Sequence, residues 1–406
     1  MVLQPDAHTT DSIANRNKTQ ILISILKNFW WYILLLILLI LGFILGIFLA
    51  STASSVRSSS KTVDQNLSEG LLALKYNKVS YATTHNSYSV FGTIAAGNQF
   101  GTIKMSLDRG VRALMLDVHF LDDTKTKIAL CHASCKAGSV KIETTFDTIA
   151  DFLEIYPKNV ITIIWETTCD GESDCIAIKR ILYDVVEQSR LANILYAPLN
   201  SQDPWPTLGK MVQENQKIVQ FFDRGPFERP WDLRMWTYII ETPYSNKDKG
   251  DLNEVCIFNR GTPDDSEQLF LNNHFTYMGL LPVTTATLSY NINPYMYNRV
   301  IRCQEELGKG VTNFLAVDHW PYSDVIQTVS CLNHEDDVEI CMAHDNWRAS
   351  YAVAMTLTGC VFGILLVYGA ILIYNSHSKT KEIASDTGVE ETELLAKMPR
   401  IFPEDE

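Results

Sequence analysis

The sequence has little positive charge, with 34 lysine and arginine residues against 47 aspartate and glutamate residues. The resulting formal net charge of −13 excludes the basic face with which nucleic-acid-binding proteins approach phosphates. Internal repeats are also absent, so we do not expect a repeat architecture. At 406 residues, the chain can form one large domain or two ordinary ones with a substantial buried core.

Charged residues are missing from two long apolar runs, Phe29–Ala50 and Tyr351–Tyr374. At about 1.5 Å per residue, the first run reaches about 33 Å as a helix, and the hydrocarbon core of a bilayer is about 30 Å thick. The first run could instead be a cleaved signal peptide, but it is long for the apolar part of one. We therefore expect two transmembrane helices with a domain between them.

The flanking residues indicate the orientation of these predicted helices. Arg16, Lys18 and Lys27 precede the first run, and two lysines follow the second, which favours both tails in the cytosol. Eight of the nine cysteines lie between the runs, as is typical of disulfides in an oxidising compartment. The motif Asn66-Leu-Ser predicts a glycosylation site on the same side. We expect an integral membrane protein whose central domain is extracellular or lumenal, at the plasma membrane or in an endolysosomal or vacuolar membrane.

Composition divides the chain into seven segments. They are a cytosolic N-terminal tail (1–28), a transmembrane helix (29–50), a serine-rich stalk (51–74), a folded domain (75–332), a connector (333–350), a second transmembrane helix (351–374) and an acidic cytosolic tail (375–406). In the last segment, Leu394-Leu395 follows acidic residues and resembles a dileucine sorting signal. This motif predicts a sorting adaptor as a partner.

Short apolar runs typical of buried strands alternate with helical patterns in the folded domain. Strands are expected at 78–83, 113–120, 128–132, 160–166, 218–223, 237–241, 269–274 and 314–318. Helices are expected at 146–155, 176–188 and 208–215. Strands that alternate with helices predict an α/β fold with a parallel sheet, and about eight of them predict a closed, distorted (β/α)8 TIM barrel.

Nearly every predicted strand ends in, or is soon followed by, an acid or a histidine. These residues are His85, Asp117, His132, Glu166, Asp223, Glu241, His274 and Asp318. A single one could simply cap a loop. Barrel enzymes, however, carry their chemistry at the carboxyl ends of the strands, so the whole set predicts an active site there.

Four motifs occur in a fixed order along this domain: THNS, LDRGVRALMLDVHF, LCHASC and YPKNVITIIWE. Together they resemble the X-domain of phosphatidylinositol-specific phospholipase C, a PLC-like phosphodiesterase. The resemblance covers about residues 78–332 and is similar in particular to the anchored or secreted X-domain-containing proteins of plants and fungi. It implies a phosphoric diester hydrolase that acts on a membrane phospholipid.

The resemblance implies a catalytic role for each of three residues. His85 would be the general base that takes a proton from the attacking hydroxyl, the inositol 2-hydroxyl in that family. His132 would be the general acid that protonates the leaving glycerol oxygen, and Asp318 would orient the base. Imidazoles suit both roles because they titrate close to working pH.

The family also implies a cation that offsets charge developing on the phosphate. Carried over from the calcium-dependent members, its ligands would be Asn86, Asp117 and Glu166. The glutamate of the family's Glu-x-Asp motif is replaced here by Met115. We therefore expect a weakened Ca²⁺ site, with Mg²⁺ or no metal as alternatives.

Candidate substrate-binding residues are Arg112, Arg224 and His274. A structural salt bridge explains Arg112 better, and a structural role explains His274 equally well. His119 is expected to form a wall of the pocket. The fifth strand lacks the lysines that bind inositol phosphates in the family, which favours unsubstituted phosphatidylinositol or another lipid phosphodiester. No room remains for the regulatory modules of the mammalian signalling members.

Cysteine spacing suggests two local disulfides. Cys131 and Cys135 bracket His132, and a lumenal location favours a disulfide there over a zinc site. Cys169 and Cys175 are expected to close a short loop. Three pairings remain open for the other four cysteines between the apolar runs, Cys256, Cys303, Cys331 and Cys341.

Other functions were weighed against this one. A barrel of the sphingomyelinase D type would need the acidic pair that Met115 interrupts, and the glycerophosphodiester type opens with a motif unlike THNS. A lipid-binding or receptor-like protein that lost turnover would explain Met115 and the missing lysines. The retained histidine pair favours catalysis.

Overall fold

The computed structural model describes residues 65–94, 97–200, 204–246, 256–263, 267–278, 281–282 and 290–333. All of them fall within one compact unit, Gln65–Glu406. The predicted transmembrane segments 29–50 and 351–374, both predicted tails and the connector from residue 334 onward lie outside the described residues. Among the helices of the described ranges, none has the length and apolar character needed to cross a bilayer.

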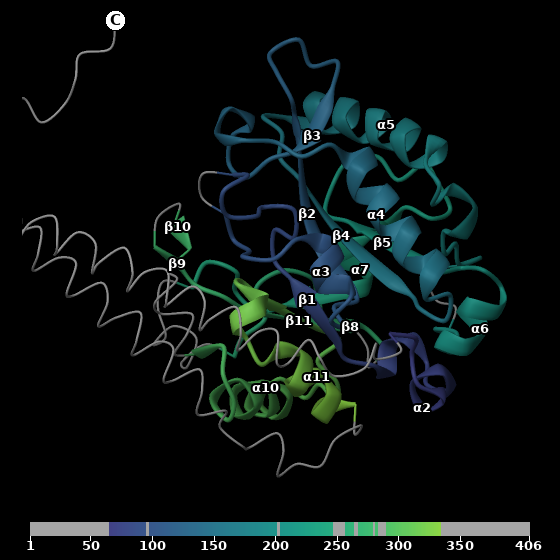
Figure 1. The fold of residues 1–406 in the computed structure, drawn as a ribbon, viewed down its shortest axis with the longest axis vertical. Helices are drawn as coiled ribbons and strands as arrows, with labels where there is room; N and C mark the ends of the chain where they lie inside the picture. Colours follow the sequence, from purple (N-terminus) through teal and green to yellow (C-terminus); the bar gives the residue numbers. More distant parts are fainter. Residues whose placement is uncertain are drawn as a thin grey trace, which may run out of the picture. The chain divides into compact units, whose positions relative to one another are not determined.

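A curled, mainly parallel sheet forms the centre of the domain (Figure 1). Its hydrogen-bonded order is β6 (Leu233–Arg234), β5 (Ile218–Phe222), β4 (Ile161–Thr167), β2 (Ala113–Phe120), β1 (Tyr81–Thr84), β11 (Phe314–Val317), β8 (Leu269–His274) and β7 (Ile239–Glu241). A ninth strand, β3 (Ile128–Leu130), pairs antiparallel with β2. Strands β9 (Tyr277–Met278) and β10 (Leu281–Pro282) form a separate antiparallel pair.

The sheet confirms the α/β class and differs from the predicted closed barrel in two respects. The run at 128–132 is not a barrel strand but the return arm of a hairpin with β2, and the eighth parallel strand is the short β6. Strands β6 and β7 are the two ends of the hydrogen-bonded order, so the described sheet is curled but open. The chain passes from β6 through a single helical turn, α7 (Met235–Tyr238), directly into β7.

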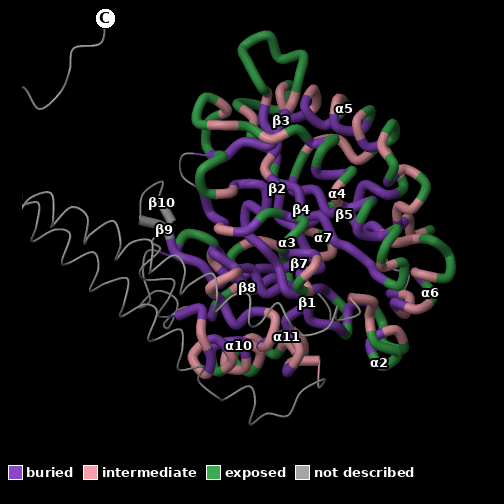
Figure 2. The backbone as a smooth tube through the Cα atoms, viewed as in Figure 1, coloured by how far each residue is buried: buried purple, intermediate pink, exposed green. Residues whose placement is uncertain are grey.

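Helices lie around the sheet, with exposed residues mainly on helices and loops and buried residues on the strands (Figure 2). They are α2 (Glu69–Ala73), α3 (Ile103–Leu107), α4 (Ile142–Ile155), α5 (Glu172–Gln188), α6 (Leu208–Gln213), α10 (Tyr295–Glu306) and α11 (Val325–Leu332), with short 3-10 turns η1 (Tyr76–Lys78), η2 (Cys135–Ala137), η3 (Ala192–Ile194) and η4 (Trp320–Tyr322). Helix α4 is amphipathic and buries Phe146, Ile149 and Leu153. Its buried face packs in the same apolar cluster as Trp165 of β4.

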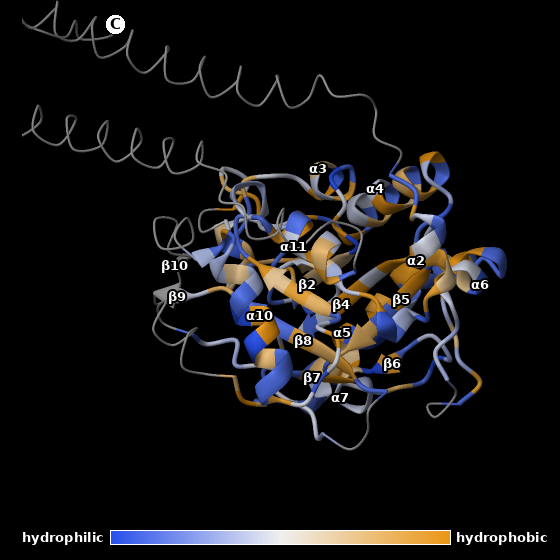
Figure 3. Cartoon of the chain, turned by 90° about the horizontal axis from the view of Figure 1, so that it is seen from below, coloured by the Kyte–Doolittle hydropathy of each residue, from blue (hydrophilic) through white to orange (hydrophobic). Residues whose placement is uncertain are grey.

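Successive strand residues alternate between two apolar clusters, and the apolar strands are visible in Figure 3. On β2, Leu114, Leu116 and Val118 belong to the cluster shared with α4 and α5, which we call the outer cluster. Ala113 and Met115 belong instead to the inner cluster, which includes Phe314, Phe221 and Leu271 of other strands. Because side chains alternate with period two, each strand's parity fixes which of its polar residues enter the interior of the curled sheet.

Candidate functional site

The alternation of side chains along each strand places most of the predicted polar residues on the inner face. Six polar residues, at the carboxyl ends of the strands, each follow a residue of the inner cluster by two positions. They are Asp117, Glu166, Asp223, Glu241, Asn273 and Asp318. These residues are close enough to affect one another's charge, because the charges of His85, Asp223, Glu241 and Arg260 all act on Glu166. The interior mouth of the sheet therefore combines several carboxylates with a histidine and an arginine.

His85 is fixed by contacts from two neighbouring strands. Strand β1 pairs in parallel with β11, so His85, directly after β1, lies beside Asp318, directly after β11. The Nδ1 atom of His85 is 2.9 Å from Oδ1 of Asp318. Phe275 stacks on the imidazole with ring centroids 3.8 Å apart and an interplanar angle of 1°. This contact with a carboxylate sets the tautomer and leaves Nε2 as the nitrogen for exchanging a proton with a substrate.

His132 lies in a short loop closed by the Cys131–Cys135 disulfide. The backbone N–H of Cys131 donates to the carbonyl of Asp117 at 3.3 Å. The Tyr88 hydroxyl donates to the Cys131 carbonyl at 2.7 Å. These contacts attach the His132 loop to the end of β2, so that Asp117 adjoins both the His85 and the His132 segments.

His119 occupies the predicted wall position next to His132. It lies two residues after Asp117 on β2 and is buried. Burial, reinforced by the neighbouring His132, lowers the pKa of His119 to about 4. A histidine with this pKa is neutral at pH 7 and adds no charge beside His132.

Asn86, Asp117 and Glu166 come from the ends of three adjacent strands, β1, β2 and β4. One end of the Asn86 amide lies 3.0 and 2.9 Å from the two Asp117 carboxylate oxygens, and the other end lies 3.3 Å from Asn98 Oδ1. With its nitrogen toward Asp117 the amide donates to both carboxylate oxygens, and with its nitrogen toward Asn98 it donates to that amide oxygen instead. Burial and the charge of Glu166 raise the pKa of Asp117. The Glu166 side chain is exposed, and partial desolvation among the neighbouring side chains raises its pKa against the opposing charge of Arg260.

These three residues fit a hard cation. Carboxylate and amide oxygens are the ligands that Ca²⁺ and Mg²⁺ prefer, and the Asn86 amide would bind a cation beside Asp117 with its oxygen turned toward that carboxylate. Met115 lies in the inner cluster and supplies no carboxylate. In the ranges that the structure covers, no three His, Cys, Asp or Glu side chains form a complete metal cage. A bound cation would therefore need water or substrate oxygens to complete its shell.

Arg260 is a site residue that the sequence analysis missed. Its Nε donates to the buried carboxylate of Glu241, and its guanidinium lies 4.6 Å from the Trp236 ring and 4.3 Å from the Tyr244 ring. Burial would lower the pKa of Arg260, but the contact with Glu241 and the charge of Glu166 raise it overall. Residue 260 lies outside every predicted strand and helix, so no periodic signal could have identified it.

Two predicted substrate contacts are corrected by the structure. His274 lies on the outward parity of β8, is fully buried and has Nε2 at 3.0 Å from the Tyr290 carbonyl and Nδ1 at 3.2 Å from Arg299. Arg112 lies at the opposite end of β2 from Asp117, where it donates to Asn159 and to backbone carbonyls. Both are structural residues because their polar atoms are used inside the protein, away from the mouth.

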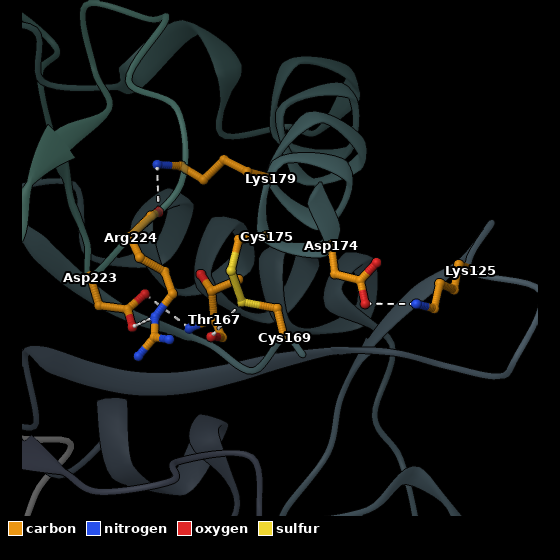
Figure 4. Close-up of a disulfide and its surroundings, with 8 residues drawn as sticks. All are labelled: Lys125, Thr167, Cys169, Asp174, Cys175, Lys179, Asp223 and Arg224. Atoms are coloured by element: carbon orange, nitrogen blue, oxygen red, sulfur yellow. Dashed lines mark hydrogen bonds and ion pairs between the residues drawn. A yellow bond between two sulfur atoms is a disulfide. The ribbon is translucent and has the colours of Figure 1, made fainter. Parts of the chain in front are cut away.

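Arg224, the third predicted contact, does lie at the carboxyl end of β5. Its Nε donates to Oδ2 of Asp223 at 2.8 Å, and its side chain is half exposed (Figure 4). Asp223 in turn accepts from the backbone N–H of Thr167 at 3.0 Å. Behind this loop, Lys179 donates to the Arg224 carbonyl at 3.3 Å. Substrate binding by Arg224 stays a prediction.

The disulfides support the cysteine analysis. Both predicted pairs, Cys131–Cys135 and Cys169–Cys175, are present, and the second is drawn in Figure 4. A third bond joins Cys256 to Cys303, which reduces the pairings that the sequence left open. Cys331 is also disulfide-bonded, while Cys341 lies outside the described residues. The Asn66 side chain accepts from Lys158 N, and its glycosylation stays a prediction.

Comparison with known proteins agrees with these motifs. A family model described as PI-PLC X matches residues 71–333. An uncharacterized secreted protein of Arthroderma benhamiae is 26% identical over 331 residues, which cover 74% of this chain and 70% of that protein. A PI-PLC X domain-containing protein of Arabidopsis thaliana is 28% identical over 62% of this chain and 60% of its own length. The phosphatidylinositol-specific phospholipase C structure from Listeria monocytogenes aligns at 15% identity with a TM-score of 0.45, covering 68% of this chain and 99% of that one.

Proposed function

This chain belongs to the PI-PLC X family, and from that membership we propose that it cleaves a lipid phosphodiester of the phosphatidylinositol type. The observation that carries the proposal is the buried contact between His85 Nδ1 and Asp318 Oδ1 at 2.9 Å. A carboxylate in this position holds an imidazole in the tautomer and orientation that a general base needs. The attachment of the His132 loop to β2 supports a second imidazole at the same mouth.

The proposed reaction adds one proton to His85 and removes one from His132. His85 Nε2 takes the proton of the attacking hydroxyl as its oxygen bonds to phosphorus. His132 gives a proton to the glycerol oxygen as the bond from phosphorus to that oxygen breaks. Asp318 holds His85 and stabilises its positive charge while the proton is on the ring. General acid–base transfer of this kind contributes roughly 10²- to 10⁴-fold to the rate.

Asn86, Asp117 and Glu166 would hold the cation, with Ca²⁺ preferred and Mg²⁺ as the alternative. When bound, the cation supplies positive charge to the non-bridging phosphate oxygens. These three oxygen-bearing residues end adjacent strands, and they would leave room in the shell for substrate, because Met115 occupies the position of the family's further acid. We expect the affinity to be weak for the same reason.

The presence of Arg260 favours a substrate whose headgroup carries hydroxyl or anionic oxygens. Its Nε is used by Glu241, while a guanidinium offers five N–H donors in a planar fork. Tyr244 beside it is an exposed aromatic ring. An unsubstituted inositol ring fits this arrangement better than a phosphorylated one, since the family's lysines are missing from β5.

The proposed location is outside the cytosol, on a membrane. Three disulfides between described cysteines and a fungal relative described as secreted support an oxidising compartment. The two apolar runs of the sequence are proposed as the anchors that keep the enzyme beside its lipid substrate, with Leu394-Leu395 as a signal for a sorting adaptor.

The test is headgroup release by the full-length chain, purified in detergent and added to vesicles of phosphatidylinositol, phosphatidylcholine or sphingomyelin. We expect Ca²⁺-dependent release from phosphatidylinositol that His85→Ala, His132→Ala and Asp318→Asn each reduce by at least 10²-fold. Asp324→Asn is the matched control, because Asp324 is a buried aspartate whose carboxylate accepts from the backbone N–H of Asn293. Release by His85→Ala equal to that of the wild type would refute the mechanism.

The remaining candidate, a lipid-binding protein without turnover, predicts a different result. It requires that the wild-type chain bind phosphatidylinositol vesicles yet release no headgroup from any of the three lipids. Met115 is the observation that favours this alternative, because it removes one of the family's acids.

A further inference from the structure

Asn98 is a buried polar residue that lies between the catalytic and cation-binding parts of the mouth. It follows Gly97, where a Cβ atom would lie only 2.3 Å from the backbone nitrogen of Phe91, so glycine is needed for the close approach of this segment. The Asn98 carbonyl accepts from the backbone N–H of His319 at 2.8 Å, which attaches the segment to the end of β11. Asn98 is 0% exposed and cannot meet its polar needs with bulk water.

Its side chain joins the two functional groups through hydrogen bonds. Asn98 Nδ2 donates to Asp318 Oδ1 at 3.2 Å, the same oxygen that contacts His85. Asn98 Oδ1 accepts from Asn86 Nδ2 at 3.3 Å. The other end of the Asn86 amide is 3.0 and 2.9 Å from the Asp117 oxygens. The two amides thus form a chain between Asp318, the carboxylate that contacts the proposed base, and Asp117, a carboxylate of the proposed cation site.

The chemistry of this chain restricts the direction of both amides. An amide has a donor end and an acceptor end, and an ionised carboxylate only accepts. With two amides in series between two ionised carboxylates, every combination of orientations leaves at least one contact of acceptor with acceptor. With the Asn86 nitrogen on Asp117, that contact lies between the Asn86 and Asn98 oxygens. If Asn98 donates to Asp318 and Asn86 donates to Asn98, that contact is between Asn86 Oδ1 and Asp117. A cation bound by Asp117 and Glu166 would satisfy an acceptor contact between Asn86 and Asp117. Turning either amide over moves the unsatisfied contact away from these two carboxylates.

Gln99 keeps the segment in place independently of this chain. Its Nε2 donates to the His85 carbonyl at 2.6 Å and to the Val317 carbonyl at 3.1 Å, and its Oε1 accepts from Trp320 N at 3.1 Å. Because Gln99 binds backbone on both strands, the position of Asn98 does not depend on its own side chain. Truncation of Asn98 should therefore change amide directions without displacing the loop.

We propose that Asn98 is a positioning residue that directs the carbonyl oxygen of Asn86 toward a bound divalent cation. Its direction is set by Asp318, so the carboxylate that orients the general base also orients a cation ligand that it does not touch. The inference rests on the cation-binding part of the proposed function but not on turnover. Residues that hold metal ligands in this way typically change metal affinity by about 10- to 100-fold when removed.

The test is direct measurement of Ca²⁺ affinity, by calorimetry and by the shift in melting temperature that Ca²⁺ causes, on the full-length chain in detergent. Asn98→Ala and Asp318→Asn should each weaken Ca²⁺ binding by about 10-fold or more. In the double variant the loss should be less than the product of the two single losses, because both changes release the same amide. Asn313→Ala is the matched control, since Asn313 is a buried asparagine at the other ends of the strands.

The outcomes separate this inference from the proposed activity. If the wild type binds Ca²⁺ but releases no headgroup, the enzymatic proposal fails while the affinities still decide the role of Asn98. If the wild type binds neither Ca²⁺ nor Mg²⁺, or if folded Asn98→Ala binds Ca²⁺ as tightly as the wild type, the inference is overturned. Equal weakening in Asn313→Ala would likewise overturn it, because the effect would then follow from general destabilisation.

Discussion

At the residue scale, the mouth of the sheet collects more acids than cations. Asp117, Glu166 and Asp223 repel one another, and desolvation adds to the cost of ionising the first two. Arg260 offsets part of this charge through Glu241 and Glu166. The mouth therefore carries an excess of acid that an added cation would offset, which is an arrangement suited to a phosphodiester.

Arg260 allows a test of its two roles, structure and substrate binding. Arg260→Ala should lower kcat/KM by about 10- to 100-fold, since a hydrogen bond to a charged group is worth about 1.5–3 kcal/mol. It should also reduce stability, because Glu241 is left buried without its partner. The effect on KM for phosphatidylinositol vesicles separates substrate binding from the chemical step.

The control for this change is the double variant Arg260→Met with Glu241→Gln. Removing both charges should restore most of the free energy of unfolding lost in Arg260→Ala, because no buried charge remains unpaired. Activity should stay low. Recovery of full activity in the double variant would show that Arg260 serves the fold alone.

At the element scale, two of the disulfides are expected to have different roles. The Cys131–Cys135 bond closes a loop of separation 4 that carries His132, whereas the Cys256–Cys303 bond spans a separation of 47. A disulfide stabilises mainly by restricting the unfolded chain, and more so for longer loops. The first bond should therefore matter for catalysis and the second for stability.

The corresponding variants are Cys131→Ser with Cys135→Ser, and Cys256→Ser with Cys303→Ser. By loop length the losses in free energy of unfolding are about 2 and about 4 kcal/mol, respectively. We expect the first pair to lose more kcat, because the His132 loop is released from β2. Denaturant unfolding and headgroup release measure the two effects, and a larger loss of kcat in the second pair would contradict the assignment.

Much of the sheet could be predicted because its strands are buried on both sides. The run at 113–120 appears with the same bounds as β2, since a continuous apolar run needs no knowledge of its partners. The residues at 128–132 do not indicate whether their strand pairs parallel or antiparallel. Strand β6 has only two residues, which are too few to form a recognisable pattern. The distorted barrel was therefore predicted in part: the eight parallel strands are present, but one was misidentified and the described sheet does not close between β6 and β7.

The candidate site was predictable where it follows strand parity and unpredictable where it depends on loops. His85, Asp117, Glu166 and Asp318 end strands and enter the mouth by alternation. His274 ends a strand of the opposite parity, which counting from Leu269 and Leu271 would have revealed. Asn98, Arg260 and Phe275 come from connecting segments, whose path is set by tertiary contacts that no local pattern records.

At the scale of the whole molecule, buried bases make stability depend on pH. Burial, together with the charge of Arg299, lowers the pKa of His274 to about 3, whereas an unfolded histidine titrates near 6.5. The folded state therefore binds fewer protons at intermediate pH. The stability contributed by neutral His274 is complete above about pH 6.5 and is lost as pH falls toward 3.

This sign predicts a measurable difference between the wild type and His274→Gln. Between pH 7 and pH 5, the wild type should lose about 2 kcal/mol more free energy of unfolding than the variant. The comparison of slopes is independent of the stability that the substitution itself removes. Denaturant unfolding at the two pH values provides the measurement, and parallel losses in both proteins would contradict the assignment.

The pairing of β1 with β11 has a consequence for biosynthesis. The base sits on the first strand to leave the ribosome and its carboxylate partner on the last, 233 residues later. A nascent chain that has not reached residue 314 has every other strand of the sheet but lacks the partner that gives His85 its orientation. Under the proposed mechanism, hydrolytic competence would therefore arise only when the domain is complete, and a truncated translation product would be inert toward membrane lipids.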